Sequence, residues 1–337
     1  MNADISSGAR ALQLGRLGFG GAGIGNLYRA VPDSQASAVV EAAWDAGIRY
    51  FDTAPHYGLG LSERRLGSVL KDKPRQEFAL STKVGRLLEP KQGVLMGGTD
   101  QKAEQAPGAP RDSEGFDVPA ASRRVWDFSE RGIRQSIEES LERLGLDYVD
   151  IAYLHDADVH DLAGGIRDGL PALEKLRAEG LVRAIGVGLN SAEAALDCVE
   201  AADLDLVMLA GRYTLLEQPE VPLLQRCVEK GTGVVNVGAY NSGLLARHNV
   251  PDDAHYNYGQ APHAQLERAR QLAAICGSFA VELPTAALQF GLRHAAVVNV
   301  TVGATAPEQI SDNAARMAEE VPEALWAELS RLGLIPS

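Results

Sequence analysis

Four polar residues of this sequence combine types that can move a proton, and three of them close short apolar runs. Asp52, Lys83 and His155 each end such a run, and Tyr57 follows Asp52 by five residues. A free phenol has a pKa of about 10, too high for easy proton exchange at neutral pH. A nearby ammonium favours the phenolate. A fold that brought these residues together would let Tyr57 protonate a carbonyl oxygen or deprotonate an alcohol.

Each of the four residues also has an ordinary structural explanation when taken alone. Asp52 could cap a loop, Tyr57 could pack on the surface, Lys83 could be solvated and His155 could be a satisfied core residue. Because three of them end successive strand candidates, one shared site is favoured over four separate roles. In that site the carboxylate would hold the ammonium, and the imidazole would orient a substrate oxygen.

The elements that must position these residues alternate regularly along the chain. Apolar runs of strand length and longer segments of helical period follow one another. The predicted strands are 16–20, 50–52, 78–83, 150–155, 184–187, 206–209, 233–237 and 297–301. The predicted helices are 34–45, 62–70, 129–144, 170–179, 191–202, 222–229, 264–276, 284–292, 307–317 and 322–332. Eight such units predict an α/β protein, a (β/α)8 TIM barrel formed as one domain over 1–337, with an extra C-terminal helix.

An open dinucleotide-binding sheet is the alternative, because Gly18, Gly20 and Gly23 have the GxGxxG spacing after a strand candidate. Those glycines should open directly into a helix. The following residues lack a helical period, and the helix begins only after Pro32. The context therefore disfavours this alternative.

One segment, 86–128, interrupts the alternation and is rich in glycine, proline and charge. A connection this long after the third strand is usually a functional lid or a surface insertion, and both interpretations stay open. Apolar Leu87, Leu88, Trp126 and Phe128 at its two ends predict that the ends pack while the middle is loose.

Composition excludes several classes of protein. The chain has 337 residues, of which 45% are hydrophobic, and its formal charge is −13. This acidity argues against a nucleic-acid or anionic-membrane partner. No apolar run reaches the roughly 18 residues that cross a bilayer, and the first residues lack a secretory pattern, so we expect a cytoplasmic location. Three distant cysteines, Cys198, Cys227 and Cys276, predict buried thiols rather than disulfides or a metal site.

The segment FDTAPHYGLGLSERRLG resembles the signature of the aldo-keto reductase superfamily, and STK and YLHD resemble its lysine and histidine positions. The resemblance extends from about Gly18 to Asn313. It implies a (β/α)8 barrel that binds NAD(P) across its C-terminal face without a metal. It also implies that Tyr57 is the general acid/base, that Lys83 and Asp52 tune it, and that His155 orients the substrate.

The runs IGVGLNS, AYNSGLL and VGATAPEQISDN resemble the cofactor-binding loops of this superfamily. The cofactor-binding residues that the resemblance implies are Gly21, Asp52, Asn190, Tyr240, Asn241, Ser242, Gly243, Gly303, Thr305, Gln309 and Asn313. The implied substrate-binding residues are Tyr57, Trp126, His155 and Arg212. Arg212 stands near the position of a family glutamine, so it either points into the site or packs against Tyr213 at the surface.

Within the superfamily, FGGAGIGNLY, VWDFS and YNSGLL resemble the sugar dehydrogenases that oxidise L-fucose, D-threo-aldoses or L-galactose to a lactone. Pyridoxal 4-dehydrogenase, which oxidises a cyclic hemiacetal to 4-pyridoxolactone, shares these patterns. A general aldehyde or ketone reductase and a non-catalytic cofactor-binding subunit stay open as alternatives. NAD is expected over NADP, which stays possible, because Gly303 and Gln309 stand where NADP-dependent relatives carry Lys and Arg. The sequence sets no oligomeric state.

Overall fold

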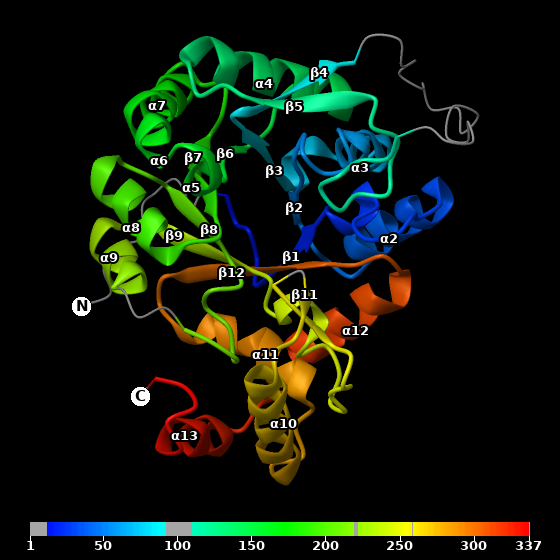
Figure 1. Cartoon of the computed structure of the whole chain (residues 1–337), viewed down its shortest axis with the longest axis vertical. Helices are drawn as coiled ribbons and strands as arrows, with labels where there is room; N and C mark the ends of the chain where they lie inside the picture. Colours follow the sequence, from blue (N-terminus) through cyan, green and yellow to red (C-terminus); the bar gives the residue numbers. More distant parts are fainter. Residues whose placement is uncertain (1–11, 92–109, 219–221, 258, 337) are drawn as a thin grey trace.

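The computed structural model describes residues 12–91, 110–218, 222–257 and 259–336 (Figure 1). Eight parallel strands close into a barrel in the order β1-β12-β9-β8-β7-β6-β3-β2. Their bounds are β1 Leu17–Gly20, β2 Tyr50–Asp52, β3 Ala79–Val84, β6 Ile151–His155, β7 Ala184–Leu189, β8 Leu206–Ala210, β9 Gly233–Val237 and β12 Val297–Gly303. The predicted barrel is confirmed, and the open dinucleotide-binding sheet is excluded.

Helices surround the strands, as Figure 1 shows. The longer ones are α2 Asp33–Asp45, α3 Leu61–Leu70, α4 Glu130–Leu144, α7 Leu170–Ala178, α8 Ala192–Ala201, α9 Leu223–Lys230, α10 His263–Ser278, α11 Leu283–Phe290, α12 Pro307–Ala318 and α13 Glu323–Arg331. The predicted helices agree with these bounds to within two residues. Strands β7 and β12 extend two residues beyond the prediction, to Leu189 and Gly303. In β7 this is because Gly188 interrupts the apolar pattern.

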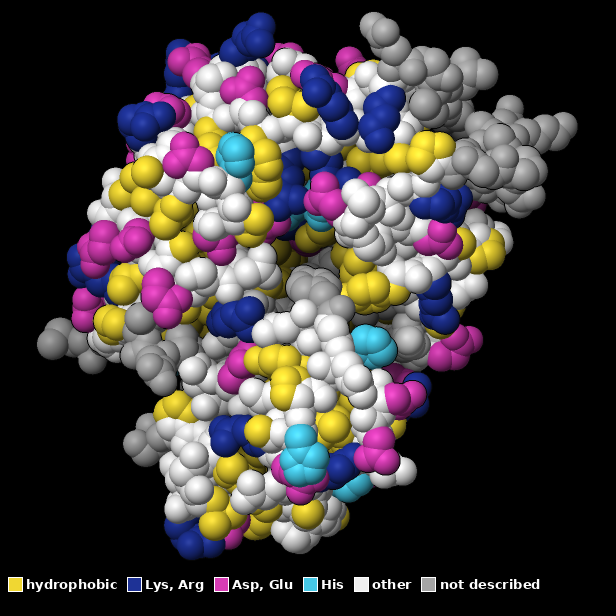
Figure 2. Space-filling model, in the orientation of Figure 1, with side chains coloured by type: hydrophobic (Ala, Val, Ile, Leu, Met, Phe, Trp, Pro, Cys, Tyr) yellow, Lys and Arg dark blue, Asp and Glu magenta, His cyan; other side chains and the backbone are white. Residues whose placement is uncertain are grey.

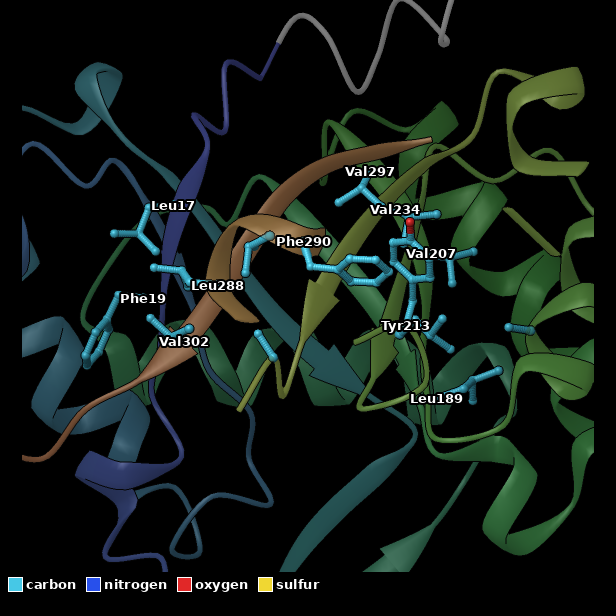
Figure 3. Packing of buried hydrophobic residues seen from close by; sticks show 14 of the residues in the cluster. Leu17, Phe19, Leu189, Val207, Tyr213, Val234, Leu288, Phe290, Val297 and Val302 are labelled. Atoms are coloured by element: carbon cyan, nitrogen blue, oxygen red, sulfur yellow. The ribbon is translucent and has the colours of Figure 1, made fainter. Parts of the chain in front are cut away.

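The main core lies between the outer face of the barrel and the helices. Figure 3 shows Phe290 of α11 beside Tyr213, with Val207 and Val234 of the neighbouring strands next to them. The ring centroids of Tyr213 and Phe290 are 5.0 Å apart. Burial of such apolar surface is the dominant favourable contribution to folding.

A second, partly polar layer fills the inside of the barrel. The fully buried Tyr50 and Tyr153 approach each other with hydroxyl oxygens 3.2 Å apart, and the hydroxyl oxygen of Tyr50 lies 3.0 Å from Ser81 Oγ. Ser81 in turn donates a hydrogen bond of 2.7 Å to Asp52 Oδ1. Hydrogen bonding inside the barrel therefore extends up to one of the four predicted catalytic residues.

The predicted insertion begins and ends as an antiparallel ribbon, β4 Arg86–Pro90 paired with β5 Ser122–Trp126. Leu87 and Phe128 are buried, so the predicted packing of the two ends is confirmed. The predicted loose middle falls largely on residues 92–109, which lie outside the described part of the chain, and the role as a lid stays a prediction. Sequence patterns did not predict this ribbon.

Residues 116–117, in the second half of the insertion, contact the loop that follows β1. Leu27 forms an isolated antiparallel bridge with Phe116, and the Asp117 amide donates to the Asn26 carbonyl at 2.8 Å. The ring centroids of Phe116 and Tyr57 lie 6.0 Å apart. Residues 110–121 therefore form one wall of the region around Tyr57.

Smaller elements complete the described chain. Between β6 and α7 lie α5 Ala157–His160, α6 Leu162–Gly164 and a π-helical turn, Gly165–Gly169, and after β9 a hairpin pairs β10 His255–Tyr256 with β11 Gly259–Gln260. The three cysteines are buried and free, as predicted. Among the described residues no single helix has the length and apolar composition of a membrane span. Only a bent pair of helices in this part of the chain has the combined length and composition of such a span: α10 together with α11 and the turn that follows it, which meet at an angle of 102°.

Gly67 sets how closely α3, which follows the Tyr57 loop, approaches α4. A Cβ atom at Gly67 would overlap the backbone carbonyl of Leu144. We predict that Gly67→Ala lowers the free energy of unfolding by about 1–3 kcal/mol, because overpacking against backbone outweighs the higher helix propensity of alanine. Urea unfolding measures this change. The exposed neighbour Ser68→Ala is the control and should stay within about 0.5 kcal/mol of the wild type. Equal stability of all three proteins would contradict the argument.

Candidate active site

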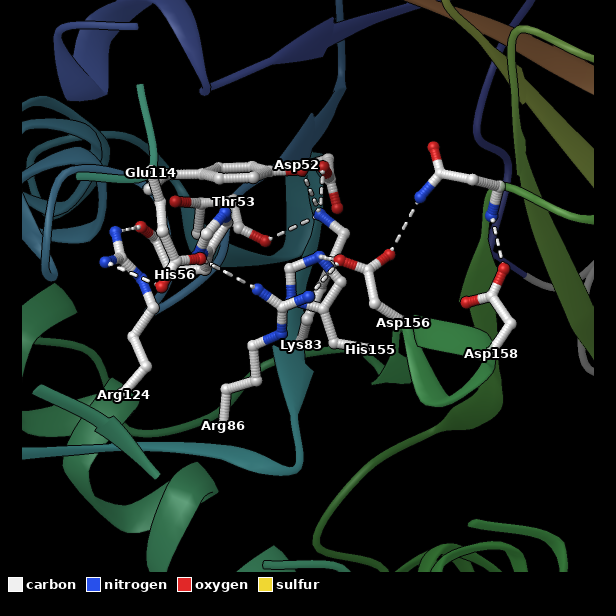
Figure 4. Close-up of polar contacts among 12 residues, drawn as sticks. Asp52, Thr53, His56, Lys83, Arg86, Glu114, Arg124, His155, Asp156 and Asp158 are labelled. Carbon is white, nitrogen blue, oxygen red and sulfur yellow. Dashed lines mark hydrogen bonds and ion pairs between the residues drawn. The ribbon is translucent and has the colours of Figure 1, made fainter. Parts of the chain in front are cut away.

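The four residues singled out by their type come together at the carboxyl ends of neighbouring strands. Asp52 closes β2, Lys83 lies near the end of β3 and His155 closes β6, and these strands are adjacent in the barrel. Tyr57 reaches the same place from the loop after β2. Active sites of (β/α)8 enzymes lie at this face. Figure 4 shows Asp52, Lys83 and His155 side by side.

Lys83 is the centre of the cluster. Its Nζ atom donates to Asp52 Oδ2 at 2.6 Å, to the Thr53 carbonyl at 3.0 Å and to Tyr57 Oη at 2.9 Å. The residue is only 2% exposed. An ammonium has three donors, so all three are satisfied and none is left for another partner. This geometry holds Tyr57 Oη at hydrogen-bond distance from a fixed positive charge.

Glycines allow the Tyr57 loop to pack against the loop after β1. A Cβ atom at Gly25 would lie 2.9 Å from the backbone carbon of Tyr57, and one at Gly58 would overlap the Gly25 carbonyl. Gly58 also has a φ of 64°, which most side chains disfavour. Tyr57 is therefore placed by a close approach of two backbones.

Burial and charge act on Tyr57 in opposite directions. Burial is the larger effect and raises the pKa of Tyr57 to about 12, although Lys83 lowers it. The expected influence of Lys83 is present, but it does not bring the pKa below the ordinary value. Burial also lowers the pKa of Lys83, yet Asp52 and Tyr57 together raise it above its ordinary value. The resting pair at neutral pH is a phenol beside an ammonium.

His155 is a neutral imidazole in this site. Burial, followed by the charges of Arg86 and Lys83, holds its pKa well below the ordinary value. Its ring stands edge-on to Tyr57, with centroids 6.1 Å apart. Within the described ranges its buried Nδ1 atom has no hydrogen-bond partner. A neutral ring nitrogen can donate to or accept from a substrate oxygen.

A charged cluster that no sequence motif indicated borders these residues. Arg86 donates to Asp156 Oδ2 at 2.5 Å and to His56 Nδ1 at 3.2 Å, and its guanidinium lies 4.1 Å from the centre of the Trp126 ring. Burial raises the pKa of Asp156 to about 6, while Arg86 lowers it. Asp156 is therefore a carboxylate at neutral pH.

A second arginine extends the cluster toward residues 110–121. Arg124 pairs with Asp112 at 2.6 Å and with Glu114 at 3.3 Å, and it donates to the His56 carbonyl at 3.0 Å. Burial, then Arg86 and Arg124, lower the pKa of His56 to about 2. Figure 2 shows basic side chains beside the central hollow of this face. No local motif marked these residues, because Arg86 meets Asp156 and Arg124 meets His56 only through contacts that span about 70 positions of the chain.

Two predicted substrate-binding residues lie beside this cluster. The Trp126 ring stacks on His160, with centroids 4.8 Å apart, on the side of β5 that also faces Arg86. Arg212 donates to the Asn190 carbonyl at 2.8 Å and pairs with Glu217 at 2.9 Å. It does not pack against Tyr213 at the surface, because Tyr213 is buried in the core. The substrate-binding roles of Trp126 and Arg212 stay predictions.

Most of the predicted cofactor-binding residues gather where the loops after β9 and β12 meet. Tyr240 donates to Asn313 Oδ1 at 2.7 Å, which joins the β9 loop to α12. Gln309 accepts from the backbone amides of Thr305 and Ala306 at the start of α12. Gly303 ends β12 beside β1.

Two further predicted cofactor-binding residues lie outside this group. Gly21 lies next to β2, and its amide donates to the Asp52 carbonyl at 2.7 Å. Asn190 stands apart from these residues and donates to Asp156 Oδ1 at 3.1 Å.

The turn after β9 has features that fit a dinucleotide. Asn241, Ser242 and Gly243 have φ values of 45°, 58° and 96° in succession. Left-handed conformations at non-glycine residues cost about 1–3 kcal/mol each and persist mainly at functional sites. The buried Oδ1 atom of Asn241 lacks a partner among residues 12–91, 110–218, 222–257 and 259–336. The amides of Asn241 and Gly243 already donate to the Gly238 and Tyr240 carbonyls, so the feature of this turn that suits a dinucleotide is the Asn241 Oδ1 acceptor, which can meet a hydroxyl or amide donor.

Comparison with known proteins places this site in a family. The model of the aldo/keto reductase family matches residues 16–333. The chain belongs to the aldo/keto reductase family. This membership confirms the resemblance carried by the FDTAPHY, STK and YLHD segments, and it identifies the protein as an oxidoreductase. Enzymes of this family use nicotinamide cofactors, in agreement with the dinucleotide fit of the β9 turn.

Relatives of this aldo/keto reductase match it along nearly their whole length. It is 51% identical to a D-threo-aldose 1-dehydrogenase from a Pseudomonas species, covering 98% of each chain. It is 38% identical to the pyridoxal 4-dehydrogenase of Microbacterium luteolum, over 97% of this chain and 96% of that one. Among solved structures, the holo form of an aldo-keto reductase from Bacillus halodurans superposes with a TM-score of 0.72 at 25% identity. That match covers 94% of this chain and 91% of the other.

Proposed function

We propose that this aldo/keto reductase oxidises the cyclic hemiacetal of an aldose to its lactone, with NAD as the cofactor. The observation that carries the reaction type is the contact of Lys83 with Asp52 and Tyr57 beside the neutral His155. The substrate class rests on the 51% identity to D-threo-aldose 1-dehydrogenase over 98% of both chains. A non-catalytic cofactor-binding subunit would have no need of this buried acid–base cluster.

In the proposed reaction, a proton leaves the anomeric hydroxyl group and a hydride leaves the anomeric carbon. The C=O bond of the lactone forms between that carbon and the hydroxyl oxygen. The bound nicotinamide supplies the hydride acceptor. Tyr57 Oη, as phenolate, takes the proton, and Lys83 stabilises that phenolate at 2.9 Å. Asp52 holds Lys83 in place. His155 directs the reacting oxygen toward Tyr57 through a ring nitrogen.

The cofactor would lie along the residues that the family resemblance indicates. Gly21 packs closely against the site, because a Cβ there would meet Ser62 Oγ at 2.5 Å and the Asp52 carbonyl at 2.9 Å, so this position beside Asp52 requires glycine. The Asn241–Gly243 turn would border the pyrophosphate, and Asn190 would flank the nicotinamide side. Tyr240, which is hydrogen-bonded to Asn313, would lie toward the adenosine end. Thr305, Gln309 and Asn313 would receive the adenosine end, next to Gly303.

The charge at that adenosine end favours NAD. Gln309 already occupies two backbone donors of the α12 N-terminus, which weakens an anion site there. Glu308 and Asp312 add negative charge to the same helix. Two cations reach this place, since Arg29 donates to Thr305 Oγ1 at 2.6 Å and Arg316 donates to Asn313 Oδ1 at 3.4 Å. Arg29 and Arg316 are side chains that could offset the preference.

Pyridoxal is a second candidate substrate, because the 38% identical relative is a pyridoxal 4-dehydrogenase. Both reactions convert a cyclic hemiacetal to a lactone, so the same acid–base cluster serves either one. An assay panel of D-arabinose, L-fucose, L-galactose and pyridoxal with NAD, followed by absorbance of the reduced cofactor, distinguishes them. Turnover of pyridoxal alone would replace the aldose assignment.

Tyr57→Phe tests the proton transfer. It removes the hydroxyl and leaves the ring in its buried place, so we expect kcat to fall at least about 10²-fold with NAD affinity nearly unchanged. Steady-state kinetics and quenching of protein fluorescence by the cofactor measure the two quantities. A variant with wild-type kcat would end this mechanism, and a wild type that binds cofactor without turnover would indicate a cofactor sensor.

The pH dependence tests the role of Lys83. Oxidation needs the phenolate, so kcat/KM should rise with pH across the alkaline range toward the Tyr57 pKa of about 12. Lys83→Met removes the cation that lowers this pKa, so the rise should move to higher pH and kcat/KM at pH 8 should fall. A deuterium isotope effect from a 1-deuterated aldose establishes that chemistry limits the rate. A flat profile with a full isotope effect would contradict Tyr57 as the base.

The cofactor preference tests the adenosine end. We expect NAD to exceed NADP in kcat/KM at least roughly tenfold, because two charge-assisted contacts of about 1.5–3 kcal/mol each are missing. Gly303→Lys with Gln309→Arg should shift the preference toward NADP, and the matched uncharged control is Gly303→Met with Gln309→Met. A side chain at position 303 has space, since its Cβ would meet only the Gly20 carbonyl at 3.6 Å. A wild type that prefers NADP would refute this part of the proposal.

A further inference from the structure

Asp156 is a charged residue at the mouth of the site that the proton transfer does not use. It directly follows His155, and its backbone has φ 46° and ψ 39°. Successive side chains of a continuing strand would point to opposite faces. The left-handed turn instead brings the Asp156 carboxylate to 3.5 Å from His155 Nε2. A strained backbone at a site is a reason to look for function.

Residues from two separate elements hold this carboxylate in one orientation, and a residue from a third fixes one of them. Arg86 of β4 donates to Oδ2 at 2.5 Å, and Asn190, after β7, donates to Oδ1 at 3.1 Å. Asn190 is itself fixed by Arg212, which donates to its carbonyl at 2.8 Å. Figure 4 shows the Asp156 carboxylate beside the Arg86 guanidinium. The carboxylate is thus positioned before any substrate arrives.

The carboxylate keeps the capacity to bind a further donor. Each carboxylate oxygen offers about two acceptor sites, so each has one left after the bonds to Arg86 and Asn190. The Asp156 side chain is 15% exposed, whereas that of Lys83 is 2% exposed. A small polar molecule that reaches His155 can therefore also reach Asp156.

An acceptor bordered by donors matches the chemistry of a hydroxyl group, which both donates and accepts. We infer that Asp156 is a specificity-determining residue that binds the hydroxyl on the carbon next to the reacting carbon of the aldose. The separation of 3.5 Å between His155 Nε2, which would orient the reacting oxygen, and Asp156 Oδ2 matches the spacing of two oxygens on adjacent carbons. This inference rests on the proposed function, and it names the hydroxyl group of the substrate that the same site recognises.

Discrimination between substrates then follows, because a substrate without this hydroxyl leaves the Asp156 carboxylate unpaired. A carbonyl compound without the adjacent hydroxyl would cover the carboxylate and give it no donor, and such unpaired polar groups discriminate strongly. If Asp156 served only as the counter-ion of Arg86, its removal would affect substrates with and without that hydroxyl equally. The two roles therefore differ in a measurable ratio.

The test compares kcat/KM for D-arabinose and 2-deoxy-D-ribose, which differ only at the hydroxyl on carbon 2. If L-galactose proves the faster parent sugar, 2-deoxy-L-galactose replaces the second sugar. We expect the wild type to prefer the parent sugar at least tenfold, and Asp156→Asn to reduce this ratio to less than a third of its wild-type value. Because the two sugars also differ in intrinsic reactivity, only the change of the ratio on mutation counts.

Two further variants keep the outcome decisive. Asp156→Gly also removes the carboxylate and accepts the left-handed backbone without strain, so it replaces Asp156→Asn if that protein is unstable. Asp168→Asn removes a carboxylate from an exposed position of the same connection and should leave the ratio unchanged. Equal losses on both sugars in the Asp156 variants would overturn the inference. Absence of any aldose turnover by the wild type would instead refute the proposed function.

Discussion

The buried ammonium of Lys83 is the interaction on which the rest of the site depends. A charge that is 2% exposed is tolerable only when it is paired and its donors are satisfied. The three acceptors come from the end of β2 and the loop that follows it. Barrel closure fixes the distance between β2 and β3, so the fold and the site constrain each other.

The burial that requires Lys83 to be paired also sets the protonation states of the residues around it. It raises the pKa of Tyr57 to about 12 and keeps His155 neutral. The enclosing wall comes partly from residues 110–121, where Phe116 lies 5.2 Å from the ring centre of His56 and 6.0 Å from that of Tyr57. The long insertion thus contributes to the electrostatics of the centre as well as to its shape.

Opposite charges alternate around the mouth of the site, and each is met by a partner from another element. Arg86 faces Asp156, and Arg124 faces Asp112. Removing one partner of such a buried pair leaves an uncompensated charge, so the ribbon, the 110–121 segment and the end of β6 are held together electrostatically. A polar, preorganised wall of this kind suits a hydroxylated substrate better than an apolar one.

The sequence by itself determined the barrel and the four residues that meet around Lys83. Regular alternation of apolar runs and helical periods is a local property, and the polar ends Asp52, Lys83 and His155 interrupt buried strands in a way that packing alone does not favour. The family motifs then indicated the cofactor loops. Where glycine broke the apolar pattern, as at Gly188 in β7, the strand extended beyond the prediction.

Only the tertiary structure decided which distant residues meet. Arg86 and Asp156 are separated by 70 positions, and Arg29 and Thr305 by 276. No periodicity or spacing marks such pairs, because each depends on how a loop folds back over the barrel. The pKa of Tyr57 could not be predicted from the sequence either, since it depends on the balance between burial, which raises it, and the charge of Lys83, which lowers it. Local pattern fixes elements, whereas desolvation and long-range pairing exist only after the elements have packed.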